Sequence, residues 1–143
     1  NKLSQPGGFT LLGEPVDLGD IKIPTYILAS KEDHIAPAKS VFKAVNLYGG
    51  PVKFMLAGSG HIAGVINPPT AQKYQHWTNA KKNTYAEFED WFADAKQHPG
   101  SWWEHWNKWL SKKSGEKVAA RVPGDGKLKI IEAAPGSYVK VRS

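Results

Sequence analysis

The chain has 143 residues, which is enough for one ordinary domain with a buried core, and 41% of the residues are hydrophobic. The formal charge is +6, and the basic residues are mostly scattered, as is typical of a solvated surface. The chain has no cysteine, so disulfides and thiolate metal sites are excluded. It also lacks a run of about 18 apolar residues, a secretory leader and a basic-aromatic pattern. We therefore expect neither a membrane span nor a nucleic-acid partner.

The first half of the chain predicts a strand–helix–strand unit. Residues 1–20 are rich in Gly and Pro and predict turns. Residues 25–30 form a nearly continuous apolar run, which is typical of a buried parallel strand. Apolar residues at helical spacing predict a helix over 38–48, ended by Gly49-Gly50. A second apolar run at 52–57 completes the unit, for which a parallel crossover is expected.

Two strands do not make a stable sheet by themselves, so we expect the rest of a larger doubly wound parallel sheet to lie outside this chain. The chain does not begin with Met, which also predicts a cut in a longer protein. The fold class predicted is α/β, with residues 1–113 as the folded part and 114–143 as a tail. Within the tail, 123–126 predicts a turn and 127–131 a short edge strand. We expect the isolated chain to be marginally stable, because its sheet exposes apolar edges and faces.

Two more helices are predicted after the second strand. Thr84, with Glu87 three residues later, forms a capping box for a helix over 85–97, which Pro99-Gly100 ends. Ser101 caps the next helix, whose large apolar side chains share one stripe and are expected to be buried. These stripe residues are Trp102, Trp103, Trp106, Trp109 and Leu110.

An acid follows the first predicted strand and a histidine follows the second. These are Asp33 and His61, the latter in the string Gly58-Ser59-Gly60-His61. Carboxyl ends of parallel strands meet at one sheet edge, and the order acid then histidine is that of α/β-hydrolases. We interpret Asp33 as the residue that orients the imidazole and His61 as the general base. On spacing alone, a helix-capping Asp and a loop His of an unrelated α/β protein fit about equally well.

The third member of such a triad, the nucleophile, is absent from this sequence. The chain has no cysteine, and no serine lies in a Gly-x-Ser-x-Gly elbow. We therefore expect the nucleophile to lie upstream of Asn1.

Around these residues the sequence resembles the C-terminal portion of class I poly(3-hydroxyalkanoate) synthases, which have an α/β-hydrolase fold. The resemblance covers most of the chain, and the string from Gly58 to Pro69 is its most specific part. It rests on residues 30–35 (SKEDHI), 58–69 (GSGHIAGVINPP), 76–79 (HWTN), 100–103 (GSWW) and 132–140 (EAAPGSYVK).

The resemblance implies an acyltransferase that polymerises (R)-3-hydroxyacyl-CoA into a polyester and releases CoA. His61 matches the base that makes a cysteine thiolate, and Asp33 matches the acid that orients this histidine or helps to activate the 3-hydroxyl. No metal and no redox cofactor is implied, since the CoA thioester is the substrate. The resemblance also implies a cytoplasmic homodimer at the surface of polyester granules, with phasin-type proteins as neighbours. Without the nucleophile, this chain alone is expected to have no synthase turnover.

Four residues are weaker candidates for a substrate pocket. His34 is adjacent to the acid, and a surface loop histidine is an equally good interpretation. Ile62 and Asn67 lie in the string that carries the resemblance. Lys73 suits a phosphate of CoA as a point charge, although an exposed, solvated lysine is the commoner case.

Two other functions remain open from the sequence. One is the C-terminal part of a serine lipase or depolymerase, whose nucleophile also lies upstream. The other is a non-catalytic module that binds hydrophobic surfaces through the tryptophan stripe. The elbow would discriminate between the enzymes, because Gly-x-Cys-x-Gly indicates a synthase and Gly-x-Ser-x-Gly a hydrolase.

Overall fold

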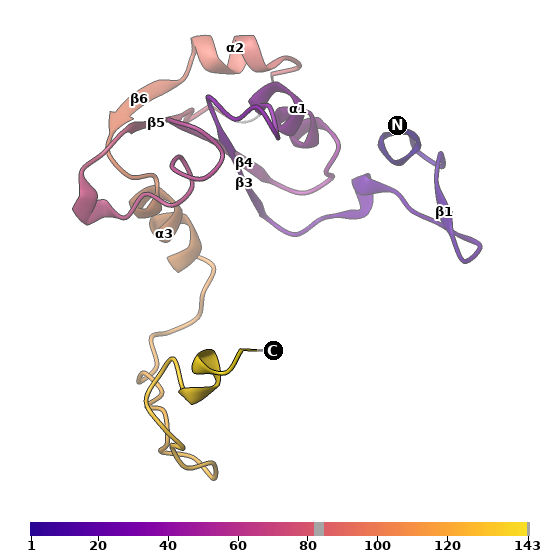
Figure 1. Cartoon of the computed structure of the whole chain (residues 1–143). Helices are drawn as coiled ribbons and strands as arrows, with labels where there is room; N and C mark the ends of the chain where they lie inside the picture. The colour runs from indigo at the N-terminus through magenta and orange to yellow at the C-terminus, as the bar shows by residue number, and fades with distance from the viewer. Residues whose placement is uncertain (82–84, 143) are drawn as a thin grey trace. The chain divides into compact units, whose positions relative to one another are not determined.

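The computed structural model describes residues 1–81 and 85–142 (Figure 1). These residues divide into two compact units, residues 1–112 and 113–143. The capping box predicted at Thr84 lies outside the described residues. How these units correspond to domains of a longer protein stays a prediction.

The first unit is built on a four-stranded sheet with the order β3-β4-β5-β6. Its strands are β3 (Thr25–Ser30), β4 (Val52–Ala57), β5 (Gln75–Thr78) and β6 (Lys96–Pro99). Strands β3 and β4 are parallel, as predicted, with their last residues Ser30 and Ala57 paired. Strands β5 and β6 are both antiparallel to their neighbours. The α/β class is confirmed, and within this chain the sheet is mixed rather than wholly parallel.

The helix predicted over 85–97 is wrong in its second half. The helix α2 spans only Phe88–Ala93, and Lys96–Pro99 form strand β6. His98 of β6 pairs with His76 of β5 across the antiparallel ladder. The gain from completing this ladder overrides the helical pattern of the local sequence.

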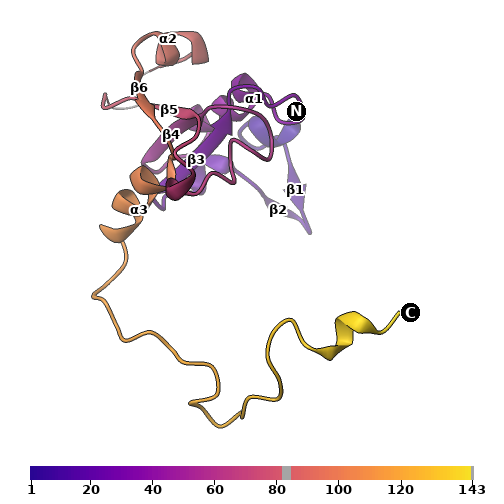
Figure 2. The ribbon, with the colours of Figure 1, turned by 60° about the vertical axis from the view of Figure 1, so that its left-hand side comes forward.

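Helices cover both faces of the sheet (Figures 1 and 2), and apolar side chains pack between them. One face is covered by α1 (Ala38–Phe42), the 3-10 turn η3 (Lys43–Asn46) and α2. These elements pack on the odd-numbered side chains of β3 and the even-numbered side chains of β4, which point to the same side of the sheet. Edge-to-face aromatic contacts centre on this core, with ring centroids 4.8 Å apart for Phe54 and Trp91. The predicted helix over 38–48 is therefore confirmed in position, with its second half a 3-10 turn.

The opposite face is covered by α3 (Trp103–Ser111). Trp102, which precedes this helix, is buried and donates its indole N–H to the carbonyl oxygens of Gly64 and Val65. Trp106 and Leu110 are 39% and 37% exposed, so the prediction of a wholly buried stripe is wrong. No residue of α3 itself is fully buried, although Trp109 in its later turns still contacts Tyr26 of β3, with ring centroids 5.3 Å apart.

The turns predicted for residues 1–20 are confirmed, whereas one prediction for the second unit is wrong. In residues 1–20, β1 (Thr10–Leu11) and β2 (Glu14–Pro15) form a small hairpin. Its turn has positive φ at Leu12 and Gly13, as a two-residue primed turn requires. In the second unit, the edge strand predicted over 127–131 is absent, and Leu128 and Ile131 are 87% and 97% exposed. Without a partner strand, this short apolar run has no ladder to join.

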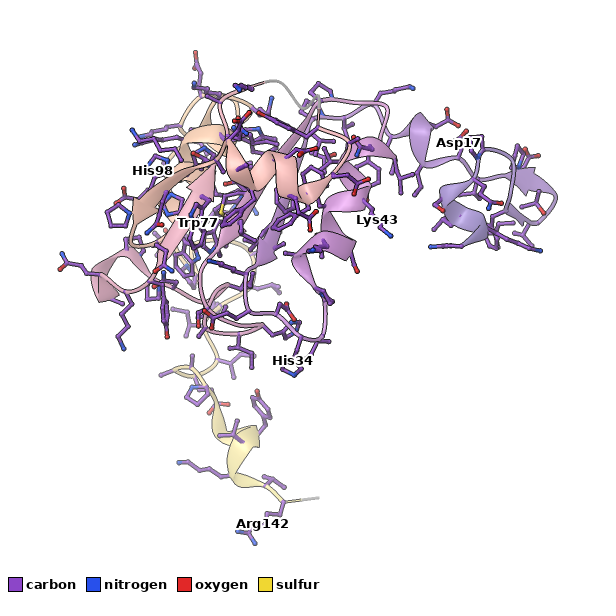
Figure 3. All side chains as sticks on the ribbon, turned by 90° about the horizontal axis from the view of Figure 1, so that it is seen from above. Asp17, His34, Lys43, Trp77, His98 and Arg142 are labelled. Atoms are coloured by element: carbon purple, nitrogen blue, oxygen red, sulfur yellow. The ribbon has the colours of Figure 1, made fainter. Side chains whose placement is uncertain are left out.

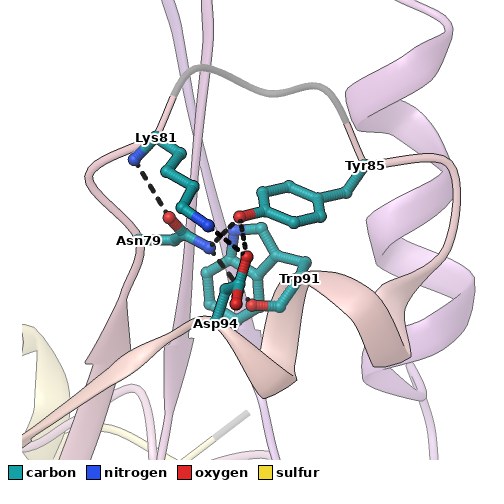
Figure 4. A network of polar contacts seen from close by, with 5 residues as sticks. All are labelled: Asn79, Lys81, Tyr85, Trp91 and Asp94. Carbon is teal, nitrogen blue, oxygen red and sulfur yellow. Dashed lines mark hydrogen bonds and ion pairs between the residues drawn. The ribbon is translucent and has the colours of Figure 1, made fainter.

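A polar network connects the end of β5 with α2 (Figure 4). The buried Asn79 donates its side-chain amide to the Tyr85 hydroxyl, at 3.0 Å, and to the carbonyl oxygen of Trp91, at 3.3 Å. Tyr85 in turn donates to the carboxylate of Asp94, which also pairs with Lys81. The network holds α2 against the sheet although the connecting loop is long.

Candidate active site

The loops after β3 and β4 bring Asp33 and His61 into contact. Nδ1 of His61 lies 2.8 Å from Oδ2 of Asp33. The parallel pairing of β3 with β4 puts both loops at one edge of the sheet, which is why residues 28 positions apart meet. The Asp33 side chain is 7% exposed and that of His61 is 47% exposed. The acid is therefore shielded, and the imidazole is open to an incoming group.

Backbone amides hold the Asp33 carboxylate in its charged form. Its Oδ1 accepts hydrogen bonds of 2.9 Å from the amides of Ile35 and Ala36. The amide of Ala36 contributes most to lowering the pKa of Asp33, and the bond to His61 adds to it. An ionised carboxylate only accepts hydrogen bonds, so Nδ1 of His61 carries the proton that it donates. Nε2 is then the basic nitrogen, and no described residue forms a hydrogen bond with it.

The loop that carries His61 is held by several backbone contacts. Glu32 donates its amide to the carbonyl oxygen of Ser59, at 3.0 Å, and Gly64 donates to Gly60, at 2.9 Å. Ser59 has a φ of +68°, which is a strained conformation for a residue with a side chain. Ser59 adopts this conformation at the sharp turn of the chain that precedes His61. The imidazole thus sits on a loop whose shape is set by its neighbours.

A surface depression of about 180 Å³ adjoins the pair. Asp33 and His61 line it together with apolar side chains of β3, α1 and the His61 loop, among them Leu28, Val41 and Val65. Its polar lining also includes Ser30, the last residue of β3, which the sequence did not single out. Ser30 begins the string 30–35 of the family resemblance, three residues before the acid, and this place in the sequence is the signal that could have found it.

His34 and Ile62 are both at the surface near the pair. His34 is exposed and points away from the body of the unit (Figure 3). Ile62 follows His61 and is 73% exposed, and Ile35 and Ile66 are also largely exposed. Ile62 does not line the depression beside the pair, so its role in a substrate pocket stays a prediction. His34 contributes no described contact to the pair.

Asn67 and Lys73 lie together but not in contact with the pair. The buried Asn67 donates its side-chain amide to the carbonyl oxygen of Lys73, at 3.0 Å. Gln72 and Tyr74, on either side of Lys73, both have positive φ. Asn67 thus shapes this loop, and the exposed Lys73 side chain is available to an anion.

A second group of titratable side chains lies on the sheet face under α3. The hydroxyl of Tyr26 is 2.7 Å from Nδ1 of His105, and the rings of His76 and His98 stack 5.2 Å apart. Burial, with a smaller effect from Lys53, lowers the pKa of His105 to about 4. His105 is therefore neutral at pH 7 and accepts the hydroxyl hydrogen of Tyr26.

No group of three or more His, Cys, Asp or Glu side chains in residues 1–81 and 85–142 is arranged to hold a metal ion. Within the same residues, no helix has the length and apolar character to cross a membrane.

Comparison with known proteins identifies the relatives of this chain. No family model matches it. It is 53% identical over 143 residues to the poly(3-hydroxyalkanoate) polymerase subunit of Rhizobium meliloti, covering all of this chain and 23% of that protein. The chain is homologous to part of poly(3-hydroxyalkanoate) polymerases.

Other polymerases match equally fully. The polymerase of Methylorubrum extorquens is 46% identical over 144 residues, and the polymerase subunit of Cupriavidus necator is 44% identical over 144 residues. Each match covers all of this chain and 24% of the relative. The chain thus spans about a quarter of the length of the polymerases it matches. The family resemblance seen in the sequence is confirmed.

Proposed function

We propose that this chain is the part of a poly(3-hydroxyalkanoate) polymerase that supplies the acid and the base of acyl transfer. The observation that carries the proposal is the 2.8 Å contact between Nδ1 of His61 and Oδ2 of Asp33, next to a depression and within a chain homologous to polymerases. Asp33 fixes the tautomer in which Nε2 of His61 is free to accept a proton.

The proposed reaction begins when Nε2 of His61 takes the proton of a cysteine thiol that another part of the polymerase supplies. The thiolate attacks the thioester carbonyl of a (R)-3-hydroxyacyl-CoA, the carbon–sulfur bond to CoA breaks, and CoA leaves with the proton. The hydroxyl end of a growing polyester then attacks the acyl-cysteine while His61 takes the hydroxyl proton. The carbon–sulfur bond to the cysteine breaks, and His61 returns this proton to the released thiolate. The Asp33 carboxylate stabilises the imidazolium that forms in each half of the reaction. The CoA thioester is the substrate, and the proposed steps use no metal and no redox cofactor.

The proposed setting of this chain is an α/β-hydrolase sheet. β3 is an edge strand here, with β4 on one side only. An open edge of a partly buried strand is suited to pairing with a further strand. We propose that the remaining strands of a doubly wound sheet continue from this edge and present the nucleophile to His61.

The weaker site candidates take subordinate roles in this proposal. Ile62 contacts the acyl group or the polyester, and Lys73 meets a phosphate of CoA. The whole enzyme is proposed to be a cytoplasmic homodimer at the granule surface, beside phasin-type proteins. The support for these partners is the homology to polymerases, whose product by name is a poly(3-hydroxyalkanoate).

Product analysis with the intact polymerase tests the proposal against hydrolysis. We expect (R)-3-hydroxybutyryl-CoA to give free CoA together with an insoluble polyester. Release of CoA with free 3-hydroxybutyrate and no polymer would instead support a lipase or depolymerase. Binding to polyester granules without CoA release would support a non-catalytic surface-binding module.

A further inference from the structure

Ser30 is buried beneath the candidate active site without a hydrogen-bond partner for its side chain. The residue is 2% exposed, and its Oγ contacts no donor or acceptor among the described residues at hydrogen-bond distance. It is the last residue of β3 and lines the same depression as Asp33 and His61. Its carbonyl oxygen accepts the amide of Asp33, so the backbone of Ser30 is already part of the turn that holds the acid.

The Ser30 hydroxyl lies against the loop that carries His61. A β-carbon built on Gly64 would lie 2.6 Å from Oγ of Ser30, 2.5 Å from the carbonyl oxygen of Gly58 and 2.8 Å from that of Gly60. All three oxygens therefore crowd the side of Gly64 on which a side chain would stand. The Ser30 hydroxyl thus faces the end of the His61 loop, on the same side of Gly64 as the carbonyl groups of Gly58 and Gly60.

An unpartnered buried hydroxyl costs free energy that alanine at the same position would avoid. Alanine would keep the strand, the turn to Asp33 and the apolar packing. A group that lowers stability and lies in a candidate active site is more readily explained by function than by folding.

We propose that Ser30 is a positioning residue of the Asp33–His61 pair, and this inference rests on the proposed acyl-transfer function. Its Oγ packs against Gly64 and so fixes the position of the loop that places His61 against Asp33. The hydroxyl hydrogen can rotate, and the carbonyl groups of Gly58 and Gly60 lie on the same side of Gly64 as this hydroxyl. When substrate binds and the loop moves, the hydroxyl donates a hydrogen bond to one of these carbonyl groups. This bond keeps the imidazole of His61 aligned with the Asp33 carboxylate. Ser30 itself does not touch the reacting atoms.

The test compares Ser30→Ala with the wild type in the intact polymerase. We expect unchanged or slightly higher stability towards urea, a kcat about ten-fold lower and an unchanged KM for 3-hydroxybutyryl-CoA. The downfield proton resonance of the His61 Nδ1–H bond should also broaden, because a looser loop exposes this proton to exchange with water. Ser101→Ala is the matched control, since Ser101 is a buried serine whose Oγ accepts the amide of Trp103. That variant should lose stability and keep the resonance and kcat.

Three results would overturn the inference. One is a Ser30→Ala polymerase with wild-type kcat and an unchanged resonance. The others are a loss of folding, or a loss of stability that accounts for the lower rate, since either would make Ser30 merely structural. The Asp33→Asn variant, measured in parallel, distinguishes failure of the Ser30 inference from failure of the proposed acyl-transfer function. If Asp33→Asn also keeps the wild-type rate, the pair itself is not the active site.

Discussion

The amide of Glu32 donates a 3.0 Å hydrogen bond to the carbonyl oxygen of Ser59, and this bond ties the loop after β3 to the loop after β4. Each loop carries one member of the candidate pair, so the 2.8 Å contact between Asp33 and His61 does not depend on their side chains alone. The backbone preorganises the pair before any substrate arrives.

Replacing Asp33 by Asn should disable the pair while preserving the fold. The Asn carbonyl oxygen can still accept from the amides of Ile35 and Ala36, but its amide group would face Nδ1 of His61 and favour the wrong tautomer. We expect kcat for CoA release by the intact polymerase to fall roughly 10²- to 10⁴-fold, by analogy with triads that lose their acid. Initial rates at saturating substrate measure this. An unchanged kcat with a raised KM, measured over a range of substrate concentrations, would show that Asp33 serves substrate binding instead.

Replacing Gly64 by Ala should distort the His61 loop. The added methyl group would lie 2.5 Å from the Gly58 carbonyl oxygen and closer than 3.0 Å to two other oxygens, so the loop must move. Overpacking of this kind costs about 1–3 kcal/mol in the free energy of unfolding. Urea denaturation measures the loss, and Gly115→Ala is the control because a β-carbon there meets no atom within 4 Å. Equal stability of the two variants would contradict the packing described for this loop.

The stability of the chain should fall as the pH drops from about 6.5 to about 4. Burial lowers the pKa of His105 from 6.5 to about 4, so the unfolded chain binds a proton in this range before the folded chain does. The resulting loss is roughly 1 to 2 kcal/mol, less than full conversion of the shift, because His105 is partly exposed. The pKa of His98 is lowered in the same direction and adds to the loss.

Several charged groups surround His105 and shape this pH dependence. Lys53, Lys108 and the imidazoles of His76 and His98 oppose its protonation. Thermal melts between pH 4 and 7 measure the effect in the wild type and in His105→Asn, whose side-chain oxygen can still accept from Tyr26. The variant should show a flatter dependence, and a curve identical to that of the wild type would contradict the assignment to His105.

The polar network at α2 should depend on Asn79 more than on its exposed ion pair. Asn79 is 4% exposed and donates to both Tyr85 and Trp91, so Asn79→Ala leaves buried groups unpaired and should cost about 1–3 kcal/mol. The pair between Lys81 and Asp94 is exposed, and Lys81→Met should change stability little. Chemical denaturation compares the variants. The reverse order would show that the surface pair holds α2 in place.

The sequence predicted the parts of the fold that depend on local pattern. The apolar runs at 25–30 and 52–57 are strands β3 and β4, and a parallel pairing was enough to predict that Asp33 and His61 meet. Strand β5 is short, and β6 lies in a stretch with helical spacing. Their pairing depends on contacts across the sheet, which the local sequence does not encode.

The role assigned to Ser30 could not be predicted from the sequence. Its significance lies in burial, in the missing partner of its hydroxyl and in the close approach of Gly64, all of which arise only when the loops are assembled. The same holds for Asn67, a pocket candidate that proves to be buried and bonded to the backbone of Lys73.

The most direct test of the central claim is the rate of CoA release by an intact polymerase that carries His61→Gln. Glutamine cannot accept the thiol proton as a base, so the rate should fall at least a thousand-fold, while His98→Gln, with an imidazole outside the pair, should keep most of the activity. A His61→Gln polymerase that releases CoA and makes polyester at the wild-type rate would contradict the claim that His61 is the base.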